Sequence, residues 1–357
     1  MEKRVKIIAF YLPQYHPIPE NDEWWGKGFT EWTNVTKAIP LFKGHYQPHL
    51  PADLGFYDLR LPEARQAQAD LAKEYGIEGF CYYHYWFGHG KQLLERPFKE
   101  VVQSGKPDFP FCLCWANDSW SGIWHGAPNK ILIKQEYPGV EDYKAHFYSL
   151  LEAFRDSRYM TVDGKKIFMI YNPGKFDDVL VFTRLWQELA VKEGLKGFHF
   201  IAHAMKDHPE KYGCDACIDN APFVSMRESR KSILDKILSK LPAIKMSGKP
   251  TVLPFAAFVD FLKRIPYSQS EYPMIMPNWD NTARSGANGW VLHGSTPALF
   301  KQMLKGAIGV AQKQEHPDNR MVFIKAWNEW AEGNHLEPDR KFGAAYLQVI
   351  KDCLEDA

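Results

Sequence analysis

The sequence predicts an α/β fold, a single (β/α)8 barrel of the TIM type with long loops after its first and sixth strands. Three observations predict it. Eight short apolar runs recur along the chain, helical patterns lie between most of them, and no glycine follows the first run in residues 11–17. A nucleotide-binding doubly wound sheet would carry a glycine-rich turn there. Eight strand–helix units in 357 residues therefore favour a closed barrel.

The predicted strands are apolar throughout, as expected when a parallel sheet is covered on both faces. They lie at residues 6–12, 79–86, 109–115, 166–171, 198–202, 214–218, 273–277 and 321–327. Apolar residues at helical spacing predict helices at residues 63–75, 97–103, 142–154, 177–192 and 297–312. The segments 13–62 and 223–272 are too long for simple connections, and long loops after barrel strands shape a cleft. We expect one domain over residues 1–357.

Composition excludes several classes of protein. The net charge is +1 and no basic stripe stands out, so nucleic acid is not an expected partner. The basic residues of segment 227–245 are more typical of a solvated helix face than of a membrane or acidic-glycan contact. Cys214 and Cys217 are expected to be buried thiols, because no second pair completes a zinc pattern. Without a signal sequence or long apolar span, we expect a cytoplasmic protein with no integral membrane segment; the oligomeric state is left open.

Aromatic residues make up 15% of the chain, and many lie beside polar residues at the ends of predicted strands. Aromatic faces that cover C–H groups and polar side chains that bind hydroxyls together favour a sugar as ligand. The candidate binding residues, taken from the strand ends and the first long loop, are Tyr11, Gln14, His16, Glu31, Trp32, Tyr83, His84, Trp86, Trp115, Asn117, Trp120, Tyr171, His203, Asn278, Asp280, Trp327 and Asn328. Because Tyr82–Trp86 alternates, about half of its rings are expected to face the helices.

Two carboxylates three residues apart, Glu329 and Glu332, follow the last predicted strand. Carboxyl pairs of this kind perform acid and base catalysis on glycosides, with inversion or retention set by their separation. A structural interpretation is that Glu332 caps a helix while Glu329 pairs with Lys325 or an arginine. We favour catalysis, because carboxylates directly after a barrel strand face the cleft.

Other site chemistries are not expected. His45 and His49 have helical spacing, but Pro48 between them interrupts a helix and no H-E-x-x-H is present, so no metal site is predicted. No G-x-S-x-G marks a serine nucleophile. We expect no cofactor.

Four motifs resemble the WbsX family, which is named for glycosyltransferases of bacterial surface-polysaccharide loci. They are residues 9–17 (AFYLPQYHP), 28–34 (GFTEWTN), 47–58 (QPHLPADLGFYD) and 326–333 (AWNEWAEG). The resemblance covers essentially the whole chain. The family is in turn similar to the endo-α-mannosidase and endo-α-mannanase barrels, in which a Glu-x-x-Glu stands at the end of the last strand.

This resemblance implies a retaining reaction without an enzyme nucleophile. Glu329 would help the sugar's 2-hydroxyl attack the anomeric carbon, which gives a 1,2-anhydro sugar, and Glu332 would protonate the leaving oxygen. As an acid, Glu332 would need a raised pKa, for which Trp327 and Trp330 could supply desolvation.

Three functions remain open at this point. The first is an endo-acting, retaining glycoside hydrolase for an α-linked polysaccharide or oligosaccharide, with mannose as a candidate sugar. The second is a glycosyltransferase or transglycosylase of surface-polysaccharide (O-antigen or capsule) biosynthesis, although no Asp-x-Asp lies near a strand end to hold a nucleotide sugar. The third is a carbohydrate-binding barrel without catalysis, which would be expected to lack one of the two carboxylates.

Overall fold

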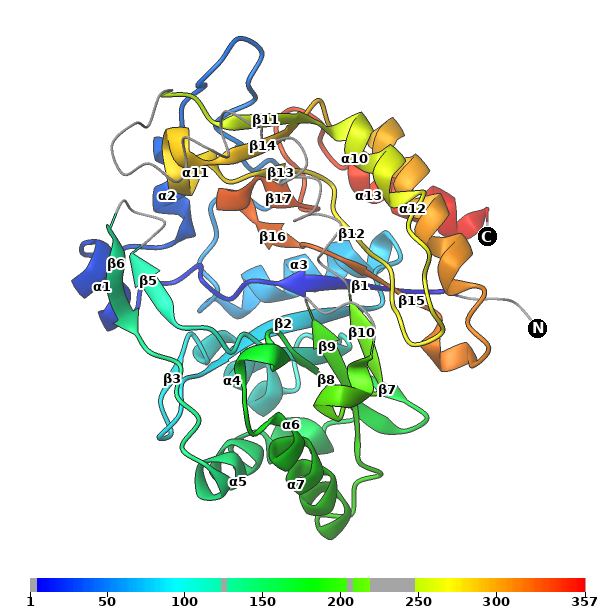
Figure 1. The fold of residues 1–357 in the computed structure, drawn as a ribbon. Coiled ribbons are helices and arrows are strands. Elements are labelled where there is room, and N and C mark those ends of the chain that lie inside the picture. Colours follow the sequence, from blue (N-terminus) through cyan, green and yellow to red (C-terminus); the bar gives the residue numbers. More distant parts are fainter. Residues whose placement is uncertain (1–4, 123–126, 204–207, 219–247, 357) are drawn as a thin grey trace, which may run out of the picture.

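Eight parallel strands form a barrel in the computed structural model, which describes residues 5–122, 127–203, 208–218 and 248–356 (Figure 1). The barrel strands are β1 (Lys6–Tyr11), β2 (Gly79–Trp86), β4 (Phe111–Trp115), β8 (Lys165–Ile170), β9 (Phe198–His203), β10 (Ala216–Ile218), β12 (Met274–Ile275) and β15 (Met321–Ile324). All eight predicted strands are thus confirmed. They pair in the order β10-β9-β8-β4-β2-β1-β15-β12.

The ring closes between β10 and the chain just before β12. Cys217 N donates to Ser270 O at 2.8 Å, and Tyr272 N donates to Cys217 O at 2.9 Å. Cys217 and Cys214 are buried free thiols, as predicted. The basic segment 227–245, in the loop after β10, lies outside the described residues.

Helices surround the barrel, and the five predicted ones are confirmed. They are α3 (Pro62–Glu74), α4 (Arg96–Ser104), α5 (Val140–Ser149) with α6 (Leu151–Arg155), α7 (Val179–Lys192) and α12 (Pro297–Ala311). Two further helices, α10 (Phe255–Leu262) and α13 (Ala345–Glu355), were not predicted. In Figure 1, α13 lies beside α12 and covers the barrel near the C-terminus. Among the described residues, no helix combines the length and apolar character needed to cross a membrane.

Short elements build the loops around the barrel. The helical ones are α1 (Pro19–Trp25), α2 (Glu31–Lys37), α11 (Thr282–Ser285), η2 (Pro173–Lys175), η3 (Pro209–Tyr212), η4 (Gly286–Asn288), η5 (Pro317–Asn319) and η6 (Trp330–Glu332). The strands are β3 (Gln92–Leu93), β5 (Trp120–Gly122), β6 (Ala127–Ile133), β7 (Thr161–Val162), β11 (Thr251–Pro254), β13 (Trp279–Asp280), β14 (Trp290–His293), β16 (Asn328–Glu329) and β17 (Asn334–His335). A second sheet, β11-β14-β13, carries α11 toward α2 and η6.

Alternation along the strands separates the barrel interior from the helix layer. Inside, the ring of Phe10 packs on Tyr83 and Phe323 at centroid distances of 5.5 and 5.9 Å. Outside, Phe168 of β8 packs on Trp186 of α7 at 4.7 Å. Aromatic rings therefore fill both the interior and the layer between strands and helices.

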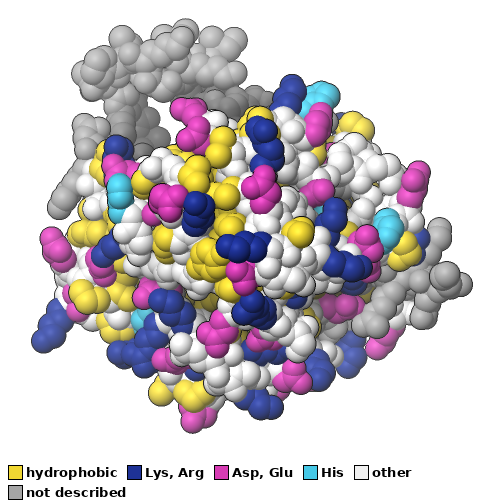
Figure 2. All heavy atoms as spheres, turned by 90° about the horizontal axis from the view of Figure 1, so that it is seen from below, with side chains coloured by type: hydrophobic (Ala, Val, Ile, Leu, Met, Phe, Trp, Pro, Cys, Tyr) yellow, Lys and Arg dark blue, Asp and Glu magenta, His cyan; other side chains and the backbone are white. Residues whose placement is uncertain are grey.

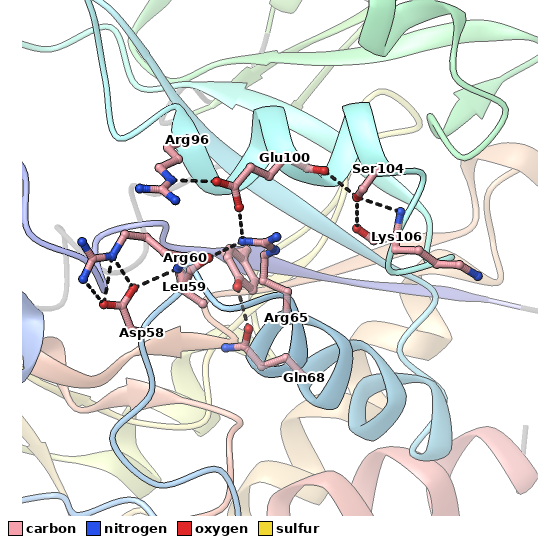
Figure 3. A network of polar contacts seen from close by, with 10 residues as sticks. Asp58, Leu59, Arg60, Arg65, Gln68, Arg96, Glu100, Ser104 and Lys106 are labelled. Atoms are coloured by element: carbon pink, nitrogen blue, oxygen red, sulfur yellow. Dashed lines mark hydrogen bonds and ion pairs between the residues drawn. The ribbon is translucent and has the colours of Figure 1, made fainter.

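Buried Arg65 of α3 anchors the end of the long loop after β1. Its Nη1 donates to Leu59 O at 2.5 Å and to Glu100 of α4 at 2.7 Å (Figure 3). Glu100 also accepts from Arg96 at 2.7 Å. On the face drawn in Figure 2, basic and acidic side chains of the described residues are interspersed.

The buried indole of Trp186 provides a test of this packing. Its side chain is fully buried, and its Nε1 donates to Tyr143 O at 3.0 Å. We expect Trp186→Ala to lower the free energy of unfolding by about 3–5 kcal/mol, because it leaves a cavity between α7 and the strands. Urea unfolding measures this. Val191→Ala on the same helix, where Val191 is 69% exposed, should change it by less than about 0.5 kcal/mol. Equal losses in both variants would contradict the assignment of faces.

Candidate active site

A cleft with a cavity of about 420 Å³ opens at the carboxyl ends of the barrel strands. Its polar and charged lining is Gln14, Glu31, Asn34, Asp118, Ser119, Ser121, Lys175, Arg284, Lys325, Glu329 and Glu332, and its aromatic lining is Trp25, Phe29, Tyr83, Tyr85, Trp120 and Tyr171. The position agrees with the general rule that functional side chains of this fold lie beyond the carboxyl ends of its strands.

Glu329 and Glu332 lie in a tight turn at the floor of this cleft. β16 pairs antiparallel with β17, and η6 connects them, so the chain reverses between the two carboxylates. Gly333 ends the turn with φ +58°, and a Cβ there would stand 2.8 Å from Asp280 Cβ. Only 4% of Glu329 and 6% of Glu332 is exposed, so their carboxyl groups meet in a largely water-excluded place.

Two cations hold the carboxylates. Arg284 of α11 donates from Nη1 to Glu332 Oε1 at 2.6 Å, and its Nη2 lies 3.0 Å from Glu31 Oε2. Lys325 Nζ lies 3.8 Å from both Glu329 Oε2 and Glu332 Oε2. Glu332 Oε2 is buried and accepts no hydrogen bond within the described chain. The second oxygen of Glu332 is therefore enclosed beside Lys325 and Glu329.

This arrangement separates the pKa values of the pair. The pKa of Glu329 is raised to about 8, mainly by burial. Lys325 opposes this shift, whereas Glu332 adds to it. Burial acts in the same direction on Glu332, but Arg284 and Lys325 outweigh it and lower its pKa to about 2. The opposite shifts make the two carboxyls one titrating pair, in which Glu329 is the more easily protonated member. The sequence-based expectation of a raised pKa on Glu332 is wrong for the free protein, because Arg284 was not foreseen.

The turn is supported from behind by Glu337, whose buried carboxylate accepts three hydrogen bonds. Its Oε2 accepts from Trp330 Nε1 at 2.6 Å and from Tyr57 OH at 2.8 Å, and its Oε1 accepts from Gln68 Nε2 at 2.6 Å. Trp330 stands between the two catalytic candidates in sequence. The network therefore fixes the residue that connects them.

Asn328 links the same turn to the first strand. Its Oδ1 accepts from Leu12 N at 2.7 Å, and its Nδ2 donates to Leu12 O at 3.0 Å. The hydroxyl of Tyr15 donates to Asn328 O and accepts from Trp330 N. Asn328, predicted to bind substrate, is fully buried and positions the backbone instead.

Five predicted binding residues line the cleft beside the two glutamates: Gln14, Glu31, Tyr83, Trp120 and Tyr171. The aromatic ones come from β2, β5 and the end of β8, and Glu31 comes from α2. They give the cleft the mixture of rings and polar groups that a sugar requires.

Four predicted residues face the helix layer, because strand parity directs them away from the barrel axis. Tyr11 OH donates to Gln68 of α3 at 2.6 Å, and His84 Nε2 lies 2.8 Å from His146 Nε2 of α5. The side chain of Trp86 donates to Asp142 at 2.9 Å. That of Trp115 donates to the carbonyl of Trp86 at 2.9 Å. These four do not line the cleft.

The remaining predicted residues also lie outside the cleft lining, each for a local reason. His16 is buried, and Trp32 donates to Tyr57 O at 2.8 Å. The Asn117 side chain bonds the backbone of Asn172, and Asp280 contacts His45 at 2.6 Å.

His203 stacks on Tyr171 at a centroid distance of 4.4 Å, below the cleft floor. Trp327 is fully buried and packs on Phe80 at 5.2 Å. Asn278 is half-buried just before β13 and is not among the lining residues.

Sequence reasoning missed Arg284, Lys325 and Tyr85 as cleft residues. Tyr85 has the same parity as Tyr83, so the alternation of β2 could have found it. Lys325 was considered only as a structural partner of Glu329. Arg284 follows the short strand β13 and no local motif distinguishes it, so only the fold brings it to Glu332.

The ion pairs of Arg284 predict a pH-dependent loss of stability. Arg284→Gln removes the cation that Glu31 and Glu332 share and leaves Glu332 only the longer contact with Lys325, so we expect a loss of about 3–5 kcal/mol at pH 7. Without Arg284 both carboxyls should have pKa values above those in the unfolded chain, so they take up protons on acidification and the loss should shrink at pH 4.5. Urea unfolding at both pH values measures this, with exposed Arg264→Gln as the control. The same loss at both pH values would contradict the ion-pair interpretation.

Solved structures share this fold. A glycoside hydrolase-like protein has a TM-score of 0.57 at 14% identity and covers 99% of this chain and 94% of its own. The GH99 endo-alpha-mannosidase from Bacteroides thetaiotaomicron in complex with bis-tris-propane has a TM-score of 0.55 at 14% identity, and the match covers 100% of this chain and 98% of that one.

Sequence relatives define the family. Two proteins named WxcX, from two strains of Xanthomonas campestris pv. campestris, are each 36% identical over 354 residues, which is 98% of this chain. The chain spans about half the length of these curated relatives (50%). Residues 7–350 match the model of the family described as Glycosyltransferase WbsX. The chain therefore belongs to the WbsX family.

Proposed function

We propose that this protein is a carbohydrate-active enzyme, and that it is a glycoside hydrolase with Glu329 and Glu332 as its catalytic pair. One observation carries the proposal: two buried carboxyls face one cleft, where burial raises the pKa of Glu329 while Arg284 and Lys325 lower that of Glu332. An acid and a base of this kind are what glycoside cleavage needs. Family membership and the glycosidase-like fold support a carbohydrate as the substrate.

The proposed reaction is retaining and passes through a 1,2-anhydro sugar. The 2-hydroxyl gives its proton to Glu329 while its oxygen attacks the anomeric carbon. The bond to the leaving oxygen breaks, and that oxygen takes a proton from Glu332. Water then adds to the anomeric carbon and returns a proton to Glu332, while the 2-oxygen recovers its proton from Glu329.

These roles require the shared proton to move when the sugar binds. The free site holds it on Glu329, whereas the reacting site needs it on Glu332. Glu332 Oε2 has no hydrogen-bond partner among the described residues and can accept this proton while Oε1 keeps its contact with Arg284. The pair thus acts as one unit with one proton, whichever carboxyl carries it at rest.

The proposed substrate is an α-linked polysaccharide or oligosaccharide that contains mannose and is cleaved internally. The shared fold of the GH99 endo-alpha-mannosidase supports the linkage and the sugar. The rings of Tyr83, Tyr85 and Trp120 provide the faces on which pyranose rings would pack.

A second candidate is transfer of the sugar to an acceptor, favoured by the description of the family as a glycosyltransferase. The same pair performs this reaction if an acceptor hydroxyl replaces water in the second step. In this reading the protein takes part in surface-polysaccharide biosynthesis.

Amide substitution of each glutamate tests the catalytic pair. We expect Glu329→Gln and Glu332→Gln each to lower turnover by at least about 100-fold, because an amide cannot transfer a proton. Glu329→Gln should keep the wild-type melting temperature, since the amide resembles the protonated acid. Product release is measured on a panel of α-linked glycans with and without sugar nucleotides, and exposed Glu74→Gln on α3 serves as control.

The outcomes of this assay separate the candidates. Release without a nucleotide supports hydrolysis, strict dependence on a sugar nucleotide supports transfer, and binding without turnover supports a non-catalytic barrel. Full activity in either glutamine variant would refute the catalytic pair.

The pH dependence of kcat/KM tests the single shared proton. Above pH 8 Glu329 loses its proton and both carboxyls are ionised, so no acid remains. We expect kcat/KM to fall about tenfold per pH unit above about pH 8. Lys325 lowers the pKa of Glu329, so Lys325→Met should move this fall to higher pH. A flat profile from pH 6 to 10 would exclude the shared proton.

A further inference from the structure

Behind the catalytic turn, on the side away from the cleft lining, three buried side chains bring ligand atoms together. His49, His335 and Asp339 each offer one nitrogen or oxygen atom, and these atoms all lie within 4.8 Å of one another. Their exposed fractions are 3%, 8% and 4%. Two come from the loop after β15 and one from the loop after β1, so the cluster joins segments that are far apart in the sequence.

Hydrogen bonding fixes the tautomer of His335. Its Nδ1 lies 3.0 Å from Glu337 O and must donate there, so Nε2 carries a lone pair. That Nε2 lies 2.9 Å from His49 Nδ1. In metal-binding histidines, the ring nitrogen that does not bind the ion commonly donates a hydrogen bond to a backbone carbonyl, which orients the ring. His335 is held further by stacking on Trp330 at a centroid distance of 3.7 Å.

A hydrogen bond between the two imidazoles does not satisfy the whole group. Nε2 of His49 is buried without a partner among the described residues, and Nδ1 of His49 faces the lone pair of His335 Nε2 at 2.9 Å, so the described residues do not pair every ring nitrogen of the cluster.

We propose that His49, His335 and Asp339 bind a zinc ion that joins the loop after β1 to the loop after β15. Two imidazoles and one carboxylate are a common protein ligand set for this ion, and water completes a tetrahedron. Two nitrogens on one zinc ion stand about 3.3 Å apart, so the observed 2.9 Å between the imidazoles has to open slightly, while the Asp339 oxygen, within 4.8 Å of both nitrogens, has to move toward the ion. The sequence motifs gave no sign of the site, because its ligands meet only in the fold.

The backbone around the cluster is already paired, so the ion would add to an existing link between the two loops. Ala52 N donates to Pro338 O at 2.9 Å, and Arg340 N donates to Leu50 O at 3.0 Å. Asp339 Oδ1 accepts from Lys341 N at 3.0 Å and from Phe342 N at 2.6 Å, which holds the carboxylate in place. The ion would lock the two loops that carry Trp330 and its support, without entering the cleft.

The chain contains a matched control in the pair His84 and His146. Their Nε2 atoms lie 2.8 Å apart and both side chains are buried. Among the described residues no carboxylate joins them in a three-ligand cluster. A histidine pair alone should not retain zinc, so this pair separates metal binding from ordinary imidazole contacts.

Metal content of the purified chain, with any affinity tag removed, tests the site. After incubation with Zn²⁺ and dialysis, we expect one zinc ion per wild-type chain by mass spectrometry of the metal. His335→Gln and Asp339→Asn should each weaken binding at least about 100-fold, while His146→Gln should keep one ion per chain. Asp339→Asn retains the oxygen that accepts from the backbone, so its fold should survive.

A second measurement needs no variant. The Co²⁺-substituted wild-type protein should show the visible absorption of a four-coordinate site, and X-ray absorption should show two imidazoles and oxygen ligands. Less than about 0.2 zinc per wild-type chain would overturn the site, as would equal binding by wild type and both ligand variants. Neither result bears on the Glu329 and Glu332 pair, whose assay is independent.

Discussion

The buried carboxylate of Glu337 is the interaction on which the site depends. It accepts hydrogen bonds from Trp330 of the turn between Glu329 and Glu332, Tyr57 of the loop after β1 and Gln68 of α3. Burial raises the pKa of Glu337 to about 7 even though these donors oppose it. A group this costly to bury specifies one arrangement of three distant segments, because no other set of donors would satisfy it.

The charges at the front of the turn complement this support. Arg284 and Lys325 bring two positive charges to a place where Glu31 and Glu332 supply two negative ones, so Glu329 can remain protonated. Burial opposes the charge of Lys325, but Glu329, Tyr171 and Glu332 raise its pKa well above the ordinary value. Neutrality of the whole group, rather than the strength of one ion pair, explains how five ionisable side chains share a buried pocket.

Strand and helix patterns sufficed to predict the barrel, since the apolar runs of β1 to β15 are set by burial on both faces. They also placed Glu329 and Glu332 at the carboxyl end of the last strand. The site residues that were placed wrongly or missed depend on two features. One is the face of a strand on which a side chain lies, and the other is contact between segments that are distant in the sequence. His84 and Trp86 alternate with Tyr83 and Tyr85, and only the register of β2 decides which pair faces the cleft. The second sheet positions Arg284 beside Glu332, and no short sequence motif predicts this sheet.

The bridge that Arg284 makes to Glu31 has a consequence for the chemistry. If protonation neutralises Glu332 during a turnover, the guanidinium still has the Glu31 carboxylate 3.0 Å away. No cation is then stranded in a dry pocket, so the electrostatic penalty of shuttling a proton across the turn stays small. Glu31 of α2 thus serves as a second counter-ion for Arg284, and it links the loop after β1 to the charge balance of the Glu329 and Glu332 pair.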